Sequence, residues 1–377
     1  MRHIAILKSR AGLAGGLEKV ATRIAGAFAQ QGNRVSVLTT GTPVDLPSCH
    51  GIDYYPIKTR RWPPFVRFEQ FDAYVQRWQS VEKADIVFGM DRNRKQTHIR
   101  LGNGVHAAFL ENRILAEGRW KHLLCHLNPM HRTILAIEKE AFAYPGLRRV
   151  IANSHMVKGQ IVQRFSIDPS MIEVIHNGVE WYEMAHDALT ALDQRRTICT
   201  NWNLDPSQFH FLFIGNGYIR KGLNRLLIGL SRLTTKAWHL SVVGKENRIS
   251  DYQAFAHQLG IQKNVRFWGI QRDTRPFYQL ADALAIPSFY DPFANVTVEA
   301  LAMGLFVVSS RWNGGHEVLS PTNGAIIENL LDDDAVTHAL EIAMNHPKTT
   351  DRTASIRNSV MPLDYSNQLQ KIVAACG

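Results

Sequence analysis

Apolar residues in the first half of the chain follow two different spacings. In Leu17–Gln31 they recur three and four residues apart, which predicts an amphipathic helix. Short runs rich in Ile, Val and Leu predict buried strands at Ile4–Leu7, Arg34–Thr39, Ile86–Gly89 and Arg149–Asn153. Strands that alternate with helices pair in parallel, so this half predicts a doubly wound sheet.

A second series of the same kind begins after the polar stretch Glu180–Asn203. Its predicted strands are Phe209–Gly215, Trp238–Val243, Val265–Trp268, Ala283–Ile286, Phe306–Ser309 and Gly324–Ile327. The sequence therefore predicts an α/β protein of two Rossmann-like, doubly wound domains, 1–180 and 181–360, that face each other across a cleft. The C-terminal segment 361–377 holds a last helical pattern, Ser366–Ala375, for which packing back on the first domain is one option.

Length and composition fit two domains. The 377 residues are long for a single domain, and 45% of them are apolar, as in ordinary globular proteins. No apolar run approaches the roughly 20 residues that cross a bilayer, and the start of the chain lacks the features of a signal peptide. The four cysteines show neither metal-ligand nor disulfide spacing. We expect a cytoplasmic protein with no metal or other cofactor, and peripheral binding to the inner face of the cytoplasmic membrane as an option.

The net charge of +10 is confined to one half of the chain. Residues 1–180 hold 25 Lys and Arg against 15 Asp and Glu, whereas residues 181–377 hold 18 of each kind. The excess indicates either an ordinary solvated surface or attraction to an anionic partner, such as a membrane leaflet or a phosphorylated substrate. No nucleic-acid-binding motif accompanies the charge, so nucleic acid is not an expected partner.

Part of the excess lies in Lys58–Trp78, which interrupts the alternation of strands and helices. This segment mixes three aromatic residues with three arginines: Trp62, Phe65, Phe68, Arg60, Arg61 and Arg67. The mixture suits docking on an anionic membrane. A plain surface loop or a lid over an acceptor explains it equally well.

The strongest local pattern is YDPFANVTVEALAMG at 290–304. It predicts a loop, a helix over about Asn295–Met303, and Gly304 as the residue that ends the helix. Asp291 on the loop and Glu299 in the helix could both face a ligand over the helix N-terminus, where free amides favour phosphate or sugar oxygens. Capping and structural hydrogen bonding are the ordinary alternatives for such a pair.

A second pattern is FLFIGNGYIRKGLNR at 211–225, a buried strand followed by a glycine-containing turn and a helix. Gly215 and Gly217 allow close approach of the backbone, and Arg220 and Lys221 place two cations beside the helix start. A departing pyrophosphate needs such positive charge. A solvated pair of cations on a helix is the simpler alternative.

The segment Gly12–Lys19 follows the first strand and opens the first helix. Gly15 and Gly16 suit a tight turn whose amides face a ligand. Because the spacing is not G-x-G-x-x-G, it is a weak indication of a nicotinamide cofactor. It fits better as a loop that closes over phosphate or sugar from the opposite domain.

The run RLGNGVH at 100–106 suggests a loop at the carboxyl end of a strand. His106 is the candidate there for contact with the donor sugar or an acceptor hydroxyl, and a structural histidine is an equal alternative. Glu138 could support this loop and is not expected to be catalytic.

These motifs, in this order, resemble glycosyltransferase family GT4, and in particular the bacterial lipopolysaccharide-core glucosyltransferases. The resemblance covers nearly the whole chain. It rests on the motifs Gly15–Leu17 (GGL), Ala152–Ser154 (ANS), Val174–Val179 (VIHNGV), Gly215–Gly222 (with RKG), Val242–Gly244 (VVG), Asn264–Gly269 (NVRFWG), Asp291–Gly304 and Gly314–Glu317 (GGHE).

The resemblance implies the GT-B fold and a site for a nucleotide-diphosphate sugar. It implies that Glu299 binds the ribose, that Arg220 and Lys221 bind the diphosphate, and that backbone near Trp268–Ile270 contacts the base. Asp291 would hold the transferred sugar together with amides at four positions, Phe293, Ala294, Asn295 and Val296. Asp291 stands where the family has Glu, which shortens the side chain by one methylene, and Ala294 stands where many relatives have Gly.

The sequence thus gives the hypothesis of a retaining, metal-independent hexosyltransferase with UDP-glucose as the implied donor and a cell-envelope glycolipid or oligosaccharide, such as the lipopolysaccharide core, as acceptor. No DxD motif follows a strand, and Arg220 and Lys221 can take the role of a metal. The family's usual front-face substitution needs no carboxylate nucleophile. The alternatives are a GT-B-like sugar-nucleotide epimerase or phosphorylase, and a non-catalytic nucleotide-sugar-binding protein.

Overall fold

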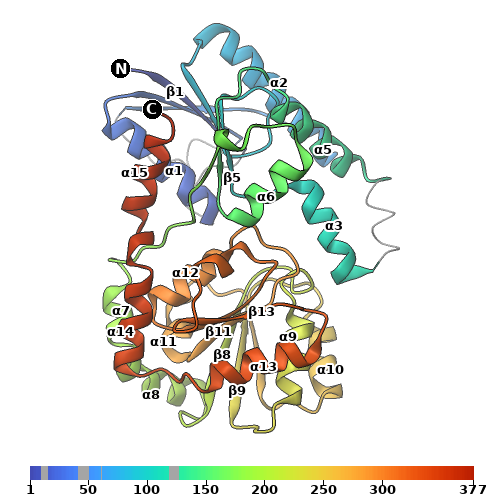
Figure 1. The fold of residues 1–377 in the computed structure, drawn as a ribbon, viewed down its shortest axis with the longest axis vertical. Coiled ribbons are helices and arrows are strands. Elements are labelled where there is room, and N and C mark those ends of the chain that lie inside the picture. The colour runs from blue at the N-terminus through green and yellow to red at the C-terminus, as the bar shows by residue number, and fades with distance from the viewer. Residues whose placement is uncertain (10–15, 41–50, 61, 119–126) are drawn as a thin grey trace. The chain divides into compact units, whose positions relative to one another are not determined.

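The computed structural model describes residues 1–9, 16–40, 51–60, 62–118 and 127–377. The chain divides into two compact units. The N-terminal unit comprises residues 1–114, 118–176 and 366–377, and the C-terminal unit comprises residues 115–117 and 177–365. The final segment of the chain therefore belongs to the N-terminal unit (Figure 1).

The N-terminal unit is built on a seven-stranded parallel sheet in the order β3-β2-β1-β4-β5-β6-β7. Its strands are β1 (His3–Leu7), β2 (Arg34–Thr39), β3 (Ile52–Pro56), β4 (Ile86–Gly89), β5 (His98–Leu101), β6 (Arg149–Ala152) and β7 (Ile172–Val174). Its helices are α1 (Gly16–Gln30), α2 (Pro64–Glu82), α3 (His106–Glu117), α5 (Pro129–Phe142), α6 (His155–Arg164), the short η2 (Pro169–Met171) and α15 (Tyr365–Ala374).

Alternation along the strands directs side chains to two helical layers. Ala5 and Leu7 of β1 point to the face that α2 covers with Phe71, Val75 and Trp78. The opposite face meets α1, where Phe28 lies edge-to-face on Phe88 of β4 with ring centroids 6.0 Å apart. Both faces are thus buried, as expected for a parallel sheet.

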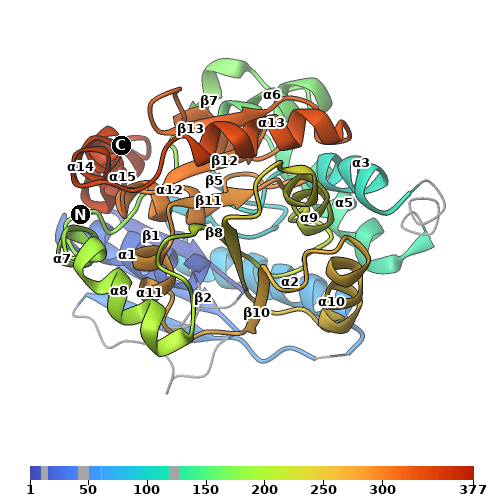
Figure 2. The same ribbon diagram turned by 90° about the horizontal axis from the view of Figure 1, so that it is seen from below.

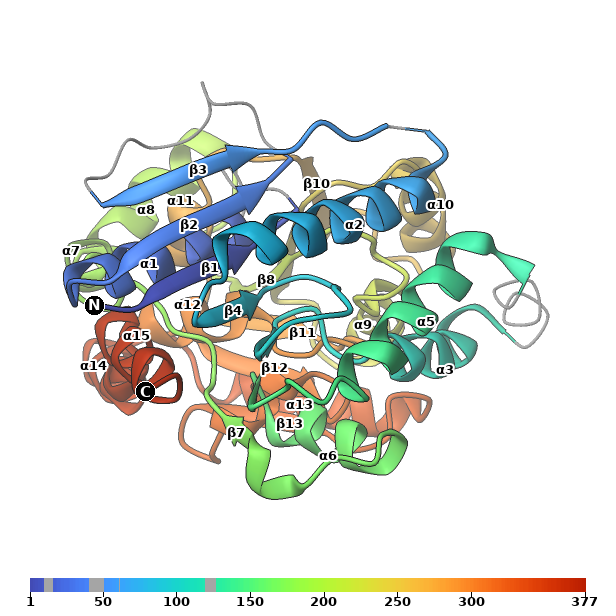
Figure 3. The ribbon, with the colours of Figure 1, turned by 90° about the horizontal axis from the view of Figure 1, so that it is seen from above.

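The two ends of the chain lie side by side in this unit, as Figures 1 and 3 show. Nη1 of Arg2 donates to the carbonyl oxygens of Cys376 and Gly377 at 3.4 and 3.1 Å. At the start of α15, the side chain of Gln368 donates to the carbonyl of His176 at 2.8 Å.

The C-terminal unit is built on a six-stranded parallel sheet in the order β10-β9-β8-β11-β12-β13. Its strands are β8 (Phe209–Ile214), β9 (Trp238–Val243), β10 (Val265–Gly269), β11 (Ala283–Ile286), β12 (Phe306–Ser310) and β13 (Gly324–Ile327). Its helices are α7 (Ala185–Leu189), α8 (Ala191–Trp202), α9 (Leu223–Arg232), α10 (Ile249–Gln258), α11 (Arg275–Leu280), α12 (Asn295–Ala302), α13 (Asp333–Met344) and α14 (Thr350–Ser359), with the short η3 (Gly314–Val318) and η4 (Met361–Leu363).

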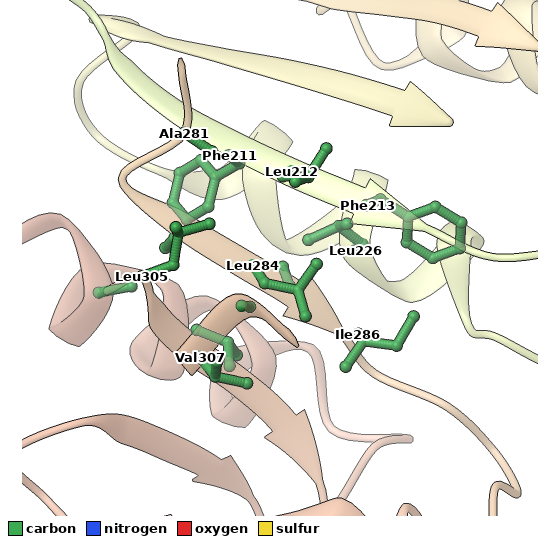
Figure 4. Packing of buried hydrophobic residues seen from close by; sticks show 14 of the residues in the cluster. Phe211, Leu212, Phe213, Leu226, Ala281, Leu284, Ile286, Leu305 and Val307 are labelled. Atoms are coloured by element: carbon green, nitrogen blue, oxygen red, sulfur yellow. The ribbon is translucent and has the colours of Figure 1, made fainter. Parts of the chain in front are cut away.

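The core of this unit is built from continuous apolar strands. Phe211 and Phe213 of β8 and Leu284 and Ile286 of β11 are fully buried, and Leu226 of α9 packs onto them (Figure 4). Figure 2 views the unit from below, with β8 and β11 neighbouring strands at the centre of the sheet. This dense core holds the loops that follow these two strands.

The predicted architecture of two doubly wound parallel sheets is confirmed. Every predicted strand matches an observed strand to within one residue at each end. Among the described strands, β3 and β7 were not predicted, and β5 was expected only as an unbounded strand before the loop at 100–106. The interpretation of Lys58–Trp78 as a loop is wrong from Pro64 onward, because α2 occupies Pro64–Glu82 with Pro64 as its first residue, where a missing N–H costs nothing. The polar stretch Glu180–Asn203 is also largely helical, forming α7 and α8.

Gly222, between β8 and α9, offers a test of how closely the two central loops pack. Its φ is +76°, and a Cβ placed on it would lie 1.8 Å from the carbonyl oxygen of Pro287. We expect Gly222→Ala to lower the free energy of unfolding by about 3 kcal/mol, from left-handed strain plus overlap with backbone. The measurement is urea unfolding of the intact chain.

Gly260→Ala is the matched control, because Gly260 has a φ of +70° and a Cβ placed on it would have no atom within 4 Å. It should cost only the left-handed strain, about 1 kcal/mol. Equal losses in the two variants would show that the contact with Pro287 contributes nothing.

Candidate functional site

The centre of the C-terminal sheet is a topological switch point. The chain runs from β8 outward through β9 to β10 on one side, and from β11 outward through β12 to β13 on the other. In open parallel sheets, ligands bind outside the carboxyl ends of the two strands where the order reverses. Here the loops that follow β8 and β11 carry the predicted pyrophosphate and sugar residues.

The loop after β8 fixes Lys221 in a buried position. Its alkyl chain lies against Gly215, since a Cβ on Gly215 would meet its Cγ, Cε and Cδ at 3.1–3.3 Å. Lys221 is 7% exposed. The amide of Phe289 donates to the carbonyl of Arg220 at 2.8 Å, which joins this loop to the one after β11. Gly215 therefore makes room for the lysine side chain, a role that was not predicted.

Asp291 binds both predicted cations through one oxygen. Its Oδ2 accepts from Nζ of Lys221 at 2.5 Å and from Nη1 of Arg220 at 3.0 Å, and the same Nη1 donates to the carbonyl of Tyr290 at 2.9 Å. Burial alone would raise the pKa of the Asp291 carboxyl, but the charges of Lys221 and Arg220 hold it below its ordinary value. Burial lowers the pKa of Lys221, and Asp291 opposes this shift. The three side chains form a charged cluster with one positive charge in excess.

The N-terminus of α12 presents amides beside this cluster. The amide of Ala294 is already bonded to Oδ1 of the fully buried Asn313 at 3.0 Å, so it is not free for a sugar. The amides of Asn295 and Val296 are the first in the helix and have no partner within it. The side chain of Asn177 donates to the carbonyl of Phe293 at 3.2 Å and to Oδ1 of Asn295 at 2.7 Å. The side chains of Asn313 and Asn177 thus fix this turn.

Glu299 lies in α12, and its carboxylate is oriented by a neighbour. Its Oε2 accepts from the hydroxyl of Tyr278 on α11 at 2.7 Å. Tyr278 is 2% exposed, and burial and then the charge of Glu299 raise its pKa well above the ordinary value, so it stays a donor. This bond fixes the orientation of the Glu299 carboxylate.

The predicted base-contacting segment lies at the carboxyl end of β10. The indole of Trp268 is turned into an aromatic cluster, with its ring 4.5 Å from that of Trp202 and 5.3 Å from that of Phe277. Its Nε1 donates to Ser241 at 3.1 Å. Ile270 is 69% exposed. The Trp268 ring therefore packs on the core, whereas Ile270 is accessible for the predicted contact.

In the N-terminal unit, the predicted glycine turn is only partly described. Gly15 lies outside the described residues, and Gly16 is the first residue of α1. His106, as predicted, follows a loop at the end of a strand, and it begins α3. The role proposed for each of these residues stays a prediction.

His106 is held by two buried partners that are distant in sequence. Both carboxylate oxygens of Glu138 on α5 accept from its amide, at 3.0 and 3.1 Å, and its Nε2 lies 3.1 Å from Nδ1 of His131. Burial, with Arg92 and His131 nearby, lowers the pKa of His106 to about 3. Its ring is therefore neutral at physiological pH and can act only as a neutral hydrogen-bonding group.

The N-terminal sheet has its own switch point between β1 and β4, and a second buried ion pair lies there. Nζ of Lys8 is 2.8 Å from Oδ1 of Asp91, and Oδ2 of Asp91 accepts from the amide and hydroxyl of Ser9 at 2.6 and 2.7 Å. Burial raises the pKa of Asp91, but Lys8 and Ser9 together bring it below the ordinary value. Sequence reasoning missed this pair, although Lys8 and Asp91 each follow a predicted strand.

Two family models match the chain, essentially one for each unit. Glycosyltransferase Family 4 matches residues 14–180, and Glycosyl transferases group 1 matches residues 208–346. The chain is therefore a glycosyltransferase that combines these two domains.

Among its relatives is lipopolysaccharide glucosyltransferase WaaG of Escherichia coli strain K12, 23% identical over 340 residues, which are 88% of this chain and 86% of WaaG. The crystal structure of WaaG superposes with a TM-score of 0.79 at 20% identity and covers 99% of this chain and 98% of that one, so the fold is GT-B. The structure of Anabaena HepE in complex with UDP-glucose gives a TM-score of 0.70 at 16% identity, covering 100% and 99%. Lipopolysaccharide core biosynthesis glycosyltransferase LpsE of Rhizobium meliloti is 30% identical over 122 residues, 32% of this chain and 35% of LpsE.

No helix in the described part of the chain combines the length and apolar character needed to cross a membrane.

The ion pair of Lys221 and Asp291 gives a stability prediction. Asp291→Asn leaves Lys221 buried without its counter-charge and should lower the free energy of unfolding by about 3 kcal/mol. The double variant Lys221→Met with Asp291→Asn should recover most of this loss, because no buried charge is then left unpaired. Urea unfolding of the intact chain measures both.

The same pair predicts a pH dependence. Because the pKa of Asp291 is lowered in the folded protein, its contribution to stability is complete above the ordinary value of about 3.9 and is lost as the pH falls further, through the folded-state pKa. The Asp291→Asn variant should lack this part of the acid sensitivity. An unchanged acid profile, or a double variant less stable than the single one, would contradict the assignment.

Proposed function

We propose that the chain transfers a hexose, with retention of anomeric configuration, from a nucleotide-diphosphate sugar to a cell-envelope glycolipid. The observation that carries the proposal is the cluster of Arg220, Lys221 and Asp291 at the switch point of the C-terminal sheet. Two cations beside a helix N-terminus form a site for a diphosphate. UDP-glucose is the proposed donor, because WaaG is a glucosyltransferase and HepE has been captured with UDP-glucose.

The donor would lie across the ends of β8 and β11. Arg220 and Lys221 would bind the diphosphate, Glu299 would bind the ribose, and the Asn295 and Val296 amides would face the sugar. Oδ1 of Asp291 is the oxygen that neither cation uses, so it is the atom proposed for a sugar hydroxyl. The exposed backbone near Ile270 would contact the base.

The proposed chemistry is front-face substitution. As the glycosidic C–O bond breaks, charge develops on the departing diphosphate, and preorganised cations lower the barrier by stabilising it. A phosphate oxygen of the leaving group then takes the proton of the attacking acceptor hydroxyl. Asp291 is engaged by two cations and Glu299 by Tyr278, which supports a route in which neither serves as a covalent nucleophile.

We further propose that no divalent metal is needed. In metal-dependent transferases the ion neutralises the leaving group. Here the excess positive charge of the Arg220, Lys221 and Asp291 cluster would supply that neutralisation. Addition of EDTA should therefore leave turnover unchanged.

The acceptor is proposed to bind the N-terminal unit, which carries the whole basic excess of the chain. WaaG and LpsE are both described as proteins of lipopolysaccharide synthesis, which supports a lipopolysaccharide core acceptor. His106 is the proposed acceptor or sugar contact, acting as a neutral hydrogen-bonding group.

Lys221→Met tests the role in transfer. Methionine keeps the unbranched chain that packs on Gly215 but removes the charge, so we expect kcat to fall by roughly a hundredfold or more through weaker stabilisation of the leaving diphosphate. Nucleotide release from a panel of nucleotide sugars, with and without envelope glycolipid, measures turnover and separates transfer from acceptor-free epimerisation or hydrolysis.

Lys263→Met removes an exposed lysine of the same unit and should leave kcat unchanged. A Lys221→Met enzyme that is folded and retains near-normal kcat would rule out the proposed diphosphate contact.

The start of α2 is the proposed contact with an anionic membrane. Trp62 is 79% exposed, Arg60 is also exposed, and the guanidinium of Arg67 lies 5.7 Å from the ring centroid of the half-buried Phe68. An exposed tryptophan beside cations fits the headgroup region of a bilayer.

Liposome co-sedimentation tests this contact. Binding should increase with the fraction of phosphatidylglycerol, and Trp62→Ser should weaken it by roughly tenfold, whereas Tyr182→Ser, at an exposed aromatic residue of the other unit, should not. Binding that is independent of anionic lipid would remove the membrane from the proposal.

A further inference from the structure

A basic pocket opens at the amino-terminal ends of the strands of the N-terminal sheet. It has a volume of about 630 Å³, within the range of small-molecule sites. Its lining includes four cations, Arg2, Lys83, Arg148 and Arg149, together with buried His98 and the segment Ala375–Gly377. His106 and the Lys8–Asp91 pair follow the carboxyl ends of the strands. The pocket therefore lies at the opposite ends of the strands of the same sheet.

The four cations come from separate parts of the sequence and are brought together by the parallel sheet. Arg2 precedes β1, Lys83 follows α2 just before β4, and Arg148 and Arg149 stand at the start of β6. Because the strands are parallel, their amino-terminal ends all lie on the same side of the sheet. Lys83 has a φ of +47°, and its amide donates to the carbonyl of Gln79.

None of these cations pairs with a carboxylate side chain within the described part of the chain, and two of them donate to carbonyls. Arg2 donates to the carbonyl of Cys376 and to a main-chain carboxylate oxygen of Gly377, and Arg149 donates to the carbonyl of Ser170 at 3.1 Å. The carboxylate of Asp85, which also lines the pocket, accepts from the amide of His3 at 2.8 Å. With Asp85 and the main-chain carboxylate of Gly377 counted against them, the four cations still leave the pocket with a net positive charge.

The state of His98 shows that these charges converge. Its ring is 5% exposed, and Nδ1 lies 2.9 Å from the hydroxyl of Thr97. Burial, then Arg148, Arg149 and Arg2 in turn, lower its pKa to about 4. Three guanidinium groups thus act on one buried point, as they would on a bound anion.

We propose that this pocket is a second anion site, which binds the phosphoryl group of a phosphate monoester about as large as a sugar phosphate. Guanidinium groups match phosphate oxygens in geometry and charge. No aromatic side chain other than the imidazole of His98 lines the pocket among the residues that the structure describes, so a stacked nucleobase is not part of the proposed ligand. The site is separate from the diphosphate site of the C-terminal unit and does not depend on the proposed transfer reaction.

Glucose 6-phosphate serves as a soluble probe, and vesicles of phosphatidic acid in phosphatidylcholine as a lipid probe. Isothermal titration calorimetry should detect glucose 6-phosphate binding to the intact protein. Arg148→Gln with Arg149→Gln should weaken it by roughly tenfold or more, because two charge-assisted contacts are lost. The control Lys95→Gln with Lys139→Gln removes two exposed charges of the same unit and should bind normally.

Arg220→Gln separates this site from the diphosphate site, and it should leave the affinity for glucose 6-phosphate unchanged. If the double arginine variant folds poorly, Arg148→Gln alone is used, since its side chain is exposed. Binding only to the phosphatidic acid vesicles, lost in the arginine variant, would support the site with a lipid headgroup as its source. Equal affinity of wild type and arginine variant, loss in Arg220→Gln instead, or no binding to either probe would overturn the proposal.

Discussion

The buried ion pair of Lys221 and Asp291 is the interaction on which the candidate site depends. It joins the loop after β8 to the loop after β11, so its geometry sets the distance between the two halves of the candidate site. Buried charges cost desolvation energy, and removal of one partner from such a pair typically costs about 3–5 kcal/mol. Lys221 and Asp291 therefore constrain each other strongly. The surrounding backbone reinforces the constraint through Gly222, where only a hydrogen fits beside the carbonyl of Pro287.

The N-terminal unit repeats this arrangement with different residues. Lys8 follows its first strand and Asp91 its fourth, just as Lys221 follows the first strand and Asp291 the fourth in the C-terminal unit. Both sheets share the strand order 3-2-1-4-5, in which the first and fourth strands are neighbours at the point where the order reverses, so the loops that follow these strands lie close together. A cation on one loop and a carboxylate on the other is one way to hold them at a fixed spacing. The position of both pairs thus follows from topology, without any similarity of local sequence.

Features that depend on residues close together in the sequence could be predicted, whereas features that depend on distant residues could not. Strands β9 and β11 were predicted with their observed bounds, because every position in them is buried and eight of their ten residues are apolar. The bounds of strand β5 could not be predicted, because His98 and Arg100 occupy half of it and are nevertheless buried. Two polar residues in a strand of four residues leave no apolar pattern that would indicate a buried strand. The burial of both residues depends on elements far away in the chain.

The residues of the candidate site also fall into two groups, those that the sequence predicts and those that it does not. Arg220, Lys221, Asp291 and Glu299 stand beside recognisable turns and helix starts, and the structure brings the first three together. Asn313 and Asn177 orient the turn before α12, and Tyr278 orients Glu299, yet each of the three reaches its partner from a different element. No spacing in the sequence encodes such contacts, since they exist only after the sheet has assembled.

The substitution of Asp for the Glu of the resembling family acquires a physical meaning from this geometry. One oxygen of Asp291 serves both cations, but they are not equivalent: the side chain of Lys221 is 9% exposed and that of Arg220 is 37% exposed. Lys221 is fixed by Gly215 and Asp291, whereas Arg220 can turn toward solvent. An incoming diphosphate would therefore compete with Asp291 mainly for Arg220, while Lys221 stays in place. Since the cluster already carries one excess positive charge, such an exchange would leave Asp291 paired with Lys221, whose other N–H donors could still bind the diphosphate together with Arg220. A short carboxylate that binds both cations thereby offsets their mutual repulsion.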